Sequence, residues 1–162
     1  MDDRAHLVAQ MKNRALIYLE IYDVLAEEYG AQKAEALLSK AIYRRGRRMG
    51  AAFRKFAPAD LAGLREAFLA NVPGGKEIFR PQVLKDEAHA LDIQLHGCPL
   101  KDAWREARLP EEKVTTLCRI AGAVDKGLFE GAGFRFENRT WAPGAVGCCF
   151  LSIRTGDGKD PG

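Results

Sequence analysis

The sequence predicts an α+β domain, with an N-terminal helical layer packed on a C-terminal four-stranded antiparallel sheet that carries two further helices. Residues 1–70 repeat apolar side chains at steps of three and four, whereas residues 76–154 contain alternating runs bounded by Gly and Pro. A chain of 162 residues suits one core. We therefore expect a single domain over residues 1–154 and a disordered tail over residues 155–162, which are polar and rich in Gly.

The N-terminal segment predicts one long helix over residues 3–29, because its apolar residues follow helical spacing. The stripe consists of Val8, Met11, Ala15, Tyr18, Tyr22, Leu25 and Tyr29, widened by Leu7, Ile17, Ile21 and Val24. A stripe of this width favours a heavily buried helix. Gly30 is its expected end.

Two more helices are predicted before the sheet. The second spans residues 31–56 and ends before Pro58. Gly46 and Gly50 lie on its apolar face, where the missing side chains allow a neighbouring helix to come close. Asp60 is placed to cap the third, short helix.

The next segment predicts a pair of strands over residues 77–85 and 88–96, joined around Asp86-Glu87. In the second strand three apolar residues alternate with three polar ones, which is typical of a half-buried antiparallel strand. The apolar residues are Leu91, Ile93 and Leu95, and the polar ones are Asp92, Gln94 and His96. Pro81 places the first strand at a sheet edge.

Two helices and two strands complete the expected domain. Cys98-Pro99 begins a helix through about residue 108, and Pro110 begins another through about residue 126, each with proline near the first turn. Glycines then lead into strands over residues 134–140 and 148–154.

The charge balance excludes several classes of partner. Lys and Arg total 25 against 22 Asp and Glu, a net charge of +3, which permits an anionic ligand but is too small for the usual nucleic-acid footprint. The sequence has neither a membrane-length apolar run nor a secretory signal. We expect a cytoplasmic protein that binds a small anionic molecule, with no nucleic-acid or membrane partner and with homo-oligomerisation left open.

One basic run stands out within this balanced composition. It consists of Arg44, Arg45, Arg47, Arg48, Arg54 and Lys55. A solvated helix face is the favoured interpretation, because acidic residues elsewhere nearly cancel the charge. One arginine of the run could still anchor a substrate carboxylate through a bidentate pair.

Cys98 has the most specific setting for chemistry. It occupies the N-cap position of the helix that begins at Pro99, where free N–H groups and the helix dipole stabilise a thiolate. His96, two residues earlier, could act as its base or ion-pair partner. The alternative is a small buried cysteine at a strand-to-helix corner beside an exposed histidine.

Cys118 and Asp125 fall seven residues apart on one helix face, with Gly122 between them. A thiol and a carboxylate would then line one wall with a gap between them. A carboxylate on an apolar face is expensive without a partner, so Asp125 is a candidate for ligand binding or proton transfer. In the alternative, Cys118 is a core residue and Asp125 turns outward at a fraying helix end.

Cys148-Cys149 is expected inside a strand, so the two side chains should face opposite ways and at most one should enter a shared site. Zinc is disfavoured, because neither a C-x2-C nor an H-x3-H pair is present. We expect all four cysteines to be free thiols, since the cytoplasm is reducing.

The second half of the chain resembles the bacterial L-2-amino-thiazoline-4-carboxylic acid hydrolase family over residues 85–154. The resemblance is carried by residues 91–98 (LDIQLHGC), residues 104–110 (WREARLP), Leu117-Cys118 with Asp125, and residues 147–150 (GCCF). By position, the family cysteines fall on Cys98, Cys118 and Cys148. In the family an aspartate closely follows the second cysteine, whereas here the nearest downstream aspartate is Asp125, seven residues after Cys118. Cys149 occupies the position where the family has its last aspartate.

This resemblance implies a hydrolase that acts on a non-peptide C–N or C–S bond of a small cyclic amidine-like or thioimidate-like compound. We expect no cofactor, and the cysteine spacing disfavours a metal. The resemblance carries Cys98, Cys118 and Cys148 over as site residues. Together with the local arguments above, the expected catalytic residues are Cys98, Cys118, Asp125 and His96, and the expected substrate-binding residues are Cys148, Cys149, Trp104 and Arg139.

Because a helix N-terminus lowers a thiol pKa and apolar burial raises it, Cys98 is the expected nucleophile, His96 its proton shuttle and Asp125 the group that holds the cationic nitrogen. If the carboxylate instead acts as a base toward water, Cys118 and Asp125 form the working pair and Cys98 is structural.

A weaker similarity to the 4-vinyl reductase domain leaves a second interpretation open. In it, the chain is a non-catalytic sensor whose cysteines bind a small molecule or a metal. Fold resemblance alone does not separate the two interpretations.

Overall fold

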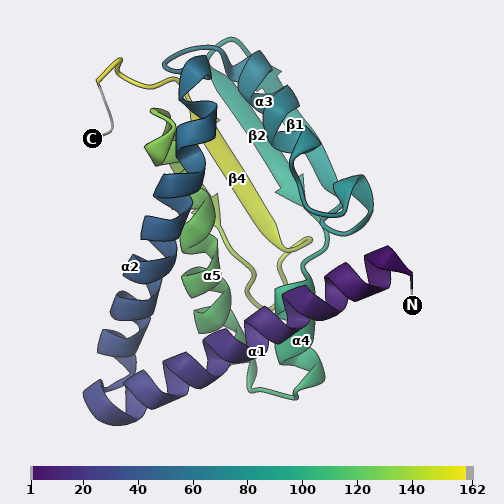
Figure 1. Cartoon of the computed structure of the whole chain (residues 1–162), viewed down its shortest axis with the longest axis vertical. Helices are drawn as coiled ribbons and strands as arrows, with labels where there is room; N and C mark the ends of the chain where they lie inside the picture. The colour runs from purple at the N-terminus through teal and green to yellow at the C-terminus, as the bar shows by residue number, and fades with distance from the viewer. Residues whose placement is uncertain (1, 160–162) are drawn as a thin grey trace.

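The computed structural model describes residues 2–159. Within them the chain forms α1 (Asp3–Tyr29), α2 (Ala31–Gly50), η1 (Ala51–Phe56), α3 (Leu61–Ala70), η2 (Gly75–Glu77), β1 (Pro81–Glu87), β2 (Ala90–Leu95), α4 (Pro99–Glu106), α5 (Glu111–Gly131), β3 (Arg135–Arg139) and β4 (Cys149–Arg154). The strands form one antiparallel sheet in the order β1-β2-β4-β3. This confirms the predicted α+β class (Figure 1).

Helices α2 and α5 lie side by side with their backbones in contact (Figure 1). Four glycines form this contact: Gly46 and Gly50 of α2, and Gly127 and Gly131 of α5. A Cβ atom at Gly46 would overlap the carbonyl oxygen of Val124, and one at Gly127 would overlap that of Tyr43. The prediction that glycines of the second helix admit a close neighbour is therefore confirmed, and α5 is that neighbour.

The same contact makes α5 longer than predicted. The sequence analysis ended this helix near residue 126, because a following glycine is a common stop signal. In the structure Gly127 is buried within the helix, which continues to Gly131. The two glycines serve close packing rather than termination, and Asp125 consequently lies inside a helix and not at a fraying end.

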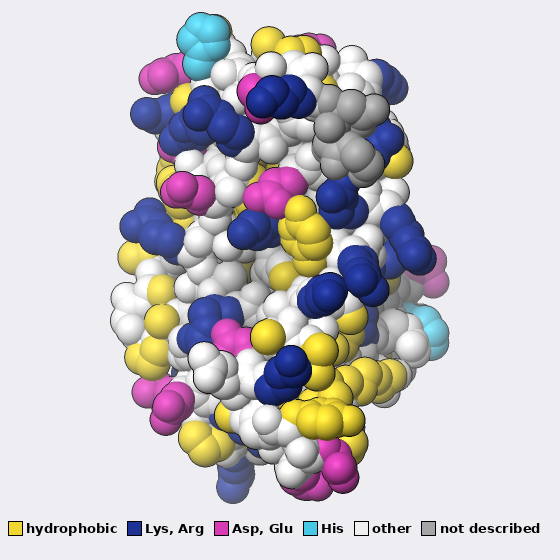
Figure 2. Space-filling model, turned by 90° about the vertical axis from the view of Figure 1, so that its left-hand side faces the viewer, with side chains coloured by type: hydrophobic (Ala, Val, Ile, Leu, Met, Phe, Trp, Pro, Cys, Tyr) yellow, Lys and Arg dark blue, Asp and Glu magenta, His cyan; other side chains and the backbone are white. Residues whose placement is uncertain are grey.

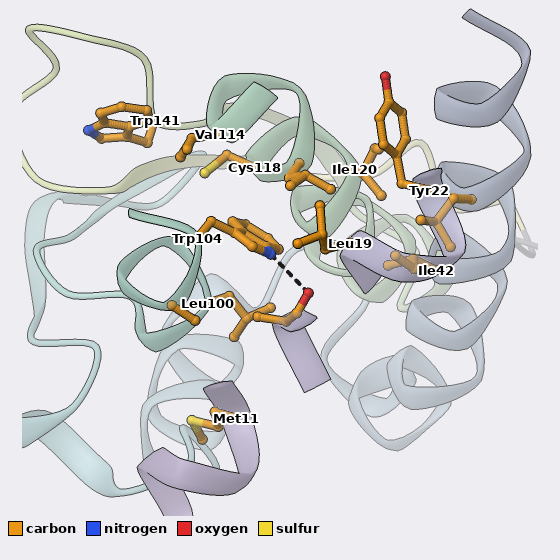
Figure 3. Close-up of a cluster of buried hydrophobic side chains, with 14 of the residues drawn as sticks. Met11, Leu19, Tyr22, Ile42, Leu100, Trp104, Val114, Cys118, Ile120 and Trp141 are labelled. Carbon is orange, nitrogen blue, oxygen red and sulfur yellow. Dashed lines mark hydrogen bonds between the residues drawn. The ribbon is translucent and has the colours of Figure 1, made fainter. Parts of the chain in front are cut away.

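Helix α1 runs from the lower end of α2 across α4 and buries only one of its faces (Figure 1). The indole Nε1–H of Trp104 in α4 donates to the backbone oxygen of Ala15 at 2.8 Å (Figure 3). The opposite face remains open: Ile17, Ile21 and Val24 are 49%, 41% and 57% exposed. The expectation that these three residues join a buried stripe was wrong, since no element among the described residues covers them, and Tyr29 of the same predicted stripe is 63% exposed.

The sheet packs its helices on one face. Leu91, Ile93 and Leu95 of β2 pair with Ile153, Leu151 and Cys149 of β4 in antiparallel register. Except for the half-buried Cys149, these side chains join the buried cluster that α3, η1 and α5 complete, so they confirm the predicted apolar side of β2.

The polar side of β2 is more buried than predicted. Asp92 accepts hydrogen bonds from Ser152 Oγ at 3.0 Å and from Arg154 at 2.7 Å. Burial alone would raise the pKa of Asp92, but these two donors outweigh it and hold the pKa below its usual value. Gln94 donates to three backbone oxygens, including that of Cys149 at 3.1 Å. The half-exposed face expected from alternation is closed by hydrogen bonds within the sheet.

The remaining boundaries differ by a few residues. The hairpin turn falls on Ala88-His89 rather than Asp86-Glu87, because Glu87 still pairs with Ala90. The helix expected over residues 31–56 continues as the tighter turn η1 after residue 50. Asp60 caps α3, as predicted, by accepting from the Gly63 N–H at 2.9 Å, and Pro81 lies in the edge strand β1.

The predicted tail begins in contact with the domain. The Gly156 N–H donates to the backbone oxygen of Pro58 at 2.8 Å. Residues 160–162 of that tail lie outside the described residues. Among the described helices, none has the length and hydrophobicity that crossing a membrane requires.

The glycine contact predicts a large cost for a single methyl group. Replacing Gly by Ala inside a helix normally gains up to about 1 kcal/mol. Gly127→Ala should instead lower the free energy of unfolding by about 2 kcal/mol or more, because the new Cβ meets backbone that cannot move aside. Urea unfolding measures this, with the exposed Lys40→Ala of α2 expected within about 0.5 kcal/mol of the parent. A Gly127→Ala protein as stable as the parent would contradict the contact.

Candidate functional site

A cavity of about 670 Å³ lies on the helix-covered face of the sheet. Its walls come from α2, η1, α3 and α5, together with the end of β2 and the start of β4. Helices α1 and α4 contribute Tyr18, Leu100 and Trp104. Cavities of roughly 300 to 1,000 Å³ are the usual size for small-molecule sites.

All four cysteines line this cavity. Cys98 lies between β2 and α4, Cys118 lies within α5, and Cys148 and Cys149 lie where β4 begins. None is part of a disulfide. The structure thus brings together three segments that are far apart in the chain, and it gathers the thiols at the end of the cavity nearest α4.

Cys148 and Cys149 do not face opposite ways, as the sequence analysis predicted. Their sulfur atoms are 3.3 Å apart, and both side chains line the cavity. The prediction failed because β4 starts only at Cys149. Cys148 precedes it in a bend after Gly147, whose φ is +66°, so strand alternation does not govern its side chain.

Cys98 is held in a setting that favours the thiolate. It is the N-cap residue of α4, as predicted. A hydrogen bond with Cys148 lowers the pKa of the Cys98 thiol. The backbone N–H groups of Leu100 and Lys101 lower this pKa further, and together they outweigh the opposing effect of burial.

The pKa values of two neighbouring thiols, Cys118 and Cys148, are raised instead of lowered. Burial raises the pKa of Cys118, and the negative charge of a nearby Cys98 thiolate adds to the effect. Hydrogen bonds with Cys149 and Cys98 raise the pKa of Cys148, as does its burial. Cys118 and Cys148 therefore keep their protons at neutral pH beside Cys98.

Asp125 projects from α5 into the same cavity. No described residue forms a hydrogen bond or an ion pair with its carboxyl group, and burial raises the pKa of that group to about 7. The predicted gap at Gly122 is filled: a Cβ there would meet Thr140 at 2.6 Å and Asn138 at 3.0 Å. Close packing of β3 against α5, rather than an open slot, explains this glycine.

Two predicted site residues lie outside the cavity. His96 hydrogen-bonds Gln82 at 2.8 Å and is not among the lining residues. Arg139 packs its guanidinium over the Phe150 ring, 4.7 Å from the centroid, and is likewise absent from the lining. Arg139 and Phe150 are cross-strand partners next to the Cys149 position, so they face the opposite side of the sheet.

Trp104 does line the cavity, but it offers only part of its surface to a ligand. Its ring is fully buried, and its one donor is already used by Ala15 (Figure 3). Cys118 lies close to it in the same buried cluster. A ligand would therefore meet apolar ring surface here rather than a hydrogen-bond donor.

Sequence reasoning missed most of the cavity wall. Four phenylalanines line it: Phe53, Phe56, Phe68 and Phe79. Three cationic residues join them: Arg14, Arg45 and Lys55. Arg45 and Lys55 belong to the basic run, in which one arginine was expected as a possible anchor for a substrate carboxylate, whereas Arg14 was not expected at the site.

No group of three or more His, Cys, Asp or Glu side chains within residues 2–159 has an arrangement that could hold a metal ion. The four cysteines line one cavity, but they do not form such a group. What the site does contain is a favoured thiolate and a carboxyl group of raised pKa. This pairing is typical of sites for nucleophilic or acid–base chemistry on a small molecule.

The chain belongs to the L-2-amino-thiazoline-4-carboxylic acid hydrolase family, whose model matches residues 10–151. The match covers nearly the whole chain, including the N-terminal helices, and not only the second half that carried the resemblance. The family name is that of a hydrolase. No curated protein and no solved structure matches the chain significantly.

The half-buried carboxyl group of Asp125 predicts a pH-dependent stability. Because the pKa of Asp125 rises from 3.8 to about 7 on folding, the folded protein binds more protons than the unfolded chain between these pH values. Stability should therefore fall as the pH rises through this window. Asp125→Asn cannot ionise, so it should exceed the parent by roughly 1 to 3 kcal/mol at pH 8 and match it near pH 4.

Urea unfolding at pH 4 and pH 8 measures this difference. Glu20→Gln on the exposed side of α1 is the matched control, and it should leave the parent's pH dependence unchanged. An Asp125→Asn variant that differs from the parent equally at both pH values would show that Asp125 is not the group responsible.

Proposed function

We propose that the protein is a hydrolase that opens a non-peptide C–N or C–S bond of a small cyclic amidine-like or thioimidate-like compound, of the L-2-amino-thiazoline-4-carboxylate type. Membership of the family supports the reaction class. The observation that carries the proposal is the lowered pKa of Cys98 in the cavity that also holds Asp125. A substrate of this kind has an electrophilic carbon between nitrogen and sulfur, which suits a thiolate nucleophile.

The covalent route conserves all atoms and consumes one water. The Cys98 thiolate attacks the carbon that joins the ring nitrogen to the ring sulfur, and the ring sulfur leaves and takes up a proton. The carbon is then bound to the Cys98 sulfur as an isothiouronium group. Water attacks this carbon, the Cys98 thiolate departs, and the product carries a urea group and a free thiol.

Asp125 supplies a negative charge that can bind the cationic amidinium group of such a substrate. Its ionised carboxylate can hold the amidinium group, and a bound cation lowers a carboxyl pKa. With a pKa near 7, Asp125 is also placed to accept a proton from the attacking water. If that base role dominates, Cys118 and Asp125 form the working pair and Cys98 is structural.

The other thiols shape the site in this proposal. Cys148 hydrogen-bonds Cys98 and stays protonated, because its own pKa is raised. Cys118 contributes apolar wall within α5. His96 has no part in the route, since its ring nitrogen is engaged with Gln82 outside the cavity.

Turnover of 2-aminothiazoline-4-carboxylate, followed by the release of free thiol, tests the proposal. The parent should release thiol, and Cys98→Ser should lower kcat/KM by at least about a thousandfold, because a hydroxyl is not ionised at neutral pH. Cys118→Ala is the matched control in the same cavity, and it should stay within about tenfold of the parent. The kcat/KM of the parent should rise with pH through about 7 as Asp125 ionises.

Two results would contradict the proposal. Loss of activity in Cys118→Ala with Cys98→Ser active would move the reaction to the Cys118–Asp125 pair. Binding without turnover of any cyclic isothiourea would favour the ligand-binding interpretation, in which the chain works as a non-catalytic sensor.

A further inference from the structure

The cavity is too large for an amino-thiazoline carboxylate alone. Such a compound has about nine non-hydrogen atoms, and at the ~30 Å³ that a water molecule takes in the liquid they would fill about 270 Å³. The cavity measures about 670 Å³. More than half of its space therefore remains for some other part of a ligand.

The unused space is apolar. The thiols come from the end of the sheet where β2 stops and β4 begins. The rest of the wall includes η1, α3 and the segment after α3, through Phe53, Phe56, Phe68 and Val72. Ordered water gains little from such a wall, whereas burying a hydrocarbon or aromatic group against it is favourable.

Cationic side chains stand beside this apolar part. Arg45 of α2 and Lys55 of η1 line the cavity while remaining exposed to solvent. Among the described residues, none forms a hydrogen bond or ion pair with Arg45, and Lys55 lies 5.1 Å from the Phe56 ring centroid. Figure 2 shows one face of the molecule on which Lys and Arg side chains gather, with hydrophobic side chains exposed between them.

From this arrangement we infer that the natural substrate is an amphipathic anion: a reactive amidine-like head at the thiols, joined to an aromatic or aliphatic arm that reaches Phe53, Phe56 and Phe68. An anionic group on the arm or head meets Arg45 or Lys55 near the solvent. This inference rests on the proposed function for the head group, but the arm is argued from the size and lining of the cavity alone.

A pair of substrates tests the arm. The compounds are 2-aminothiazoline-4-carboxylate and its 5-phenyl derivative, assayed by thiol release. Burial of the phenyl group should raise kcat/KM about tenfold or more. Met49→Glu places a carboxylate on the cavity wall at a side chain that is 37% exposed, so folding is not at risk. This variant should lose most of the preference for the phenyl compound.

The matched control is Leu84→Glu, which makes the same kind of change at a 54% exposed residue of β1 that does not line the cavity. It should keep the parent's preference. An equal or higher kcat/KM for the unsubstituted compound in the parent would overturn the inference while leaving the proposed function intact.

If neither compound is turned over, the proposed function fails, and calorimetric binding of 4-phenylbutanoate against butanoate decides the inference separately. Tighter binding of the phenyl compound by about tenfold, with a negative heat-capacity change, would support an apolar arm site. No difference between the two acids would overturn it.

Discussion

The backbone contact between α2 and α5 is the constraint on which the rest of the structure depends. Two glycines on each helix let the chains approach until carbonyl oxygens occupy the space of the missing side chains. This contact fixes the side of α5 that faces the sheet, and hence the direction of Cys118 and Asp125. It also holds α2 so that Arg45 and Met49 border the cavity, and the site is thus built by helix packing rather than by a single loop.

The groups that line the cavity differ in their protonation state. A hydrogen bond with Cys148 and the N-terminus of α4 favour the thiolate of Cys98. Burial keeps Cys118 protonated, and hydrogen bonds with Cys149 and Cys98, together with burial, do the same for Cys148. Asp125 has no partner among the described residues, and burial leaves the pKa of its carboxyl group near 7. An unpartnered carboxyl group is costly to the fold, which is the usual sign of a group retained for binding or catalysis.

Local patterns predicted the fold well, because helical spacing, caps and strand alternation are set by neighbouring residues. The N-cap position of Cys98 and the shared face of Cys118 and Asp125 followed from such patterns. What failed depended on contacts between distant segments. Helix α5 extends to Gly131 because its glycines pack against α2. Cys148 and Cys149 face the same way because the chain bends before β4. Alternation along β2 already indicated that His96 faces away from Leu95.

The ionisation of the Cys98 thiol is the property that tests the account most directly. Alkylation with iodoacetamide as a function of pH measures it, and peptide mass spectrometry distinguishes the four cysteines. The account predicts that Cys98 is labelled first and that its rate rises with a midpoint below that of an ordinary thiol, while Cys118 and Cys148 stay unlabelled until the protein is unfolded in urea. Labelling of Cys118 well below pH 8 with Cys98 inert would contradict it.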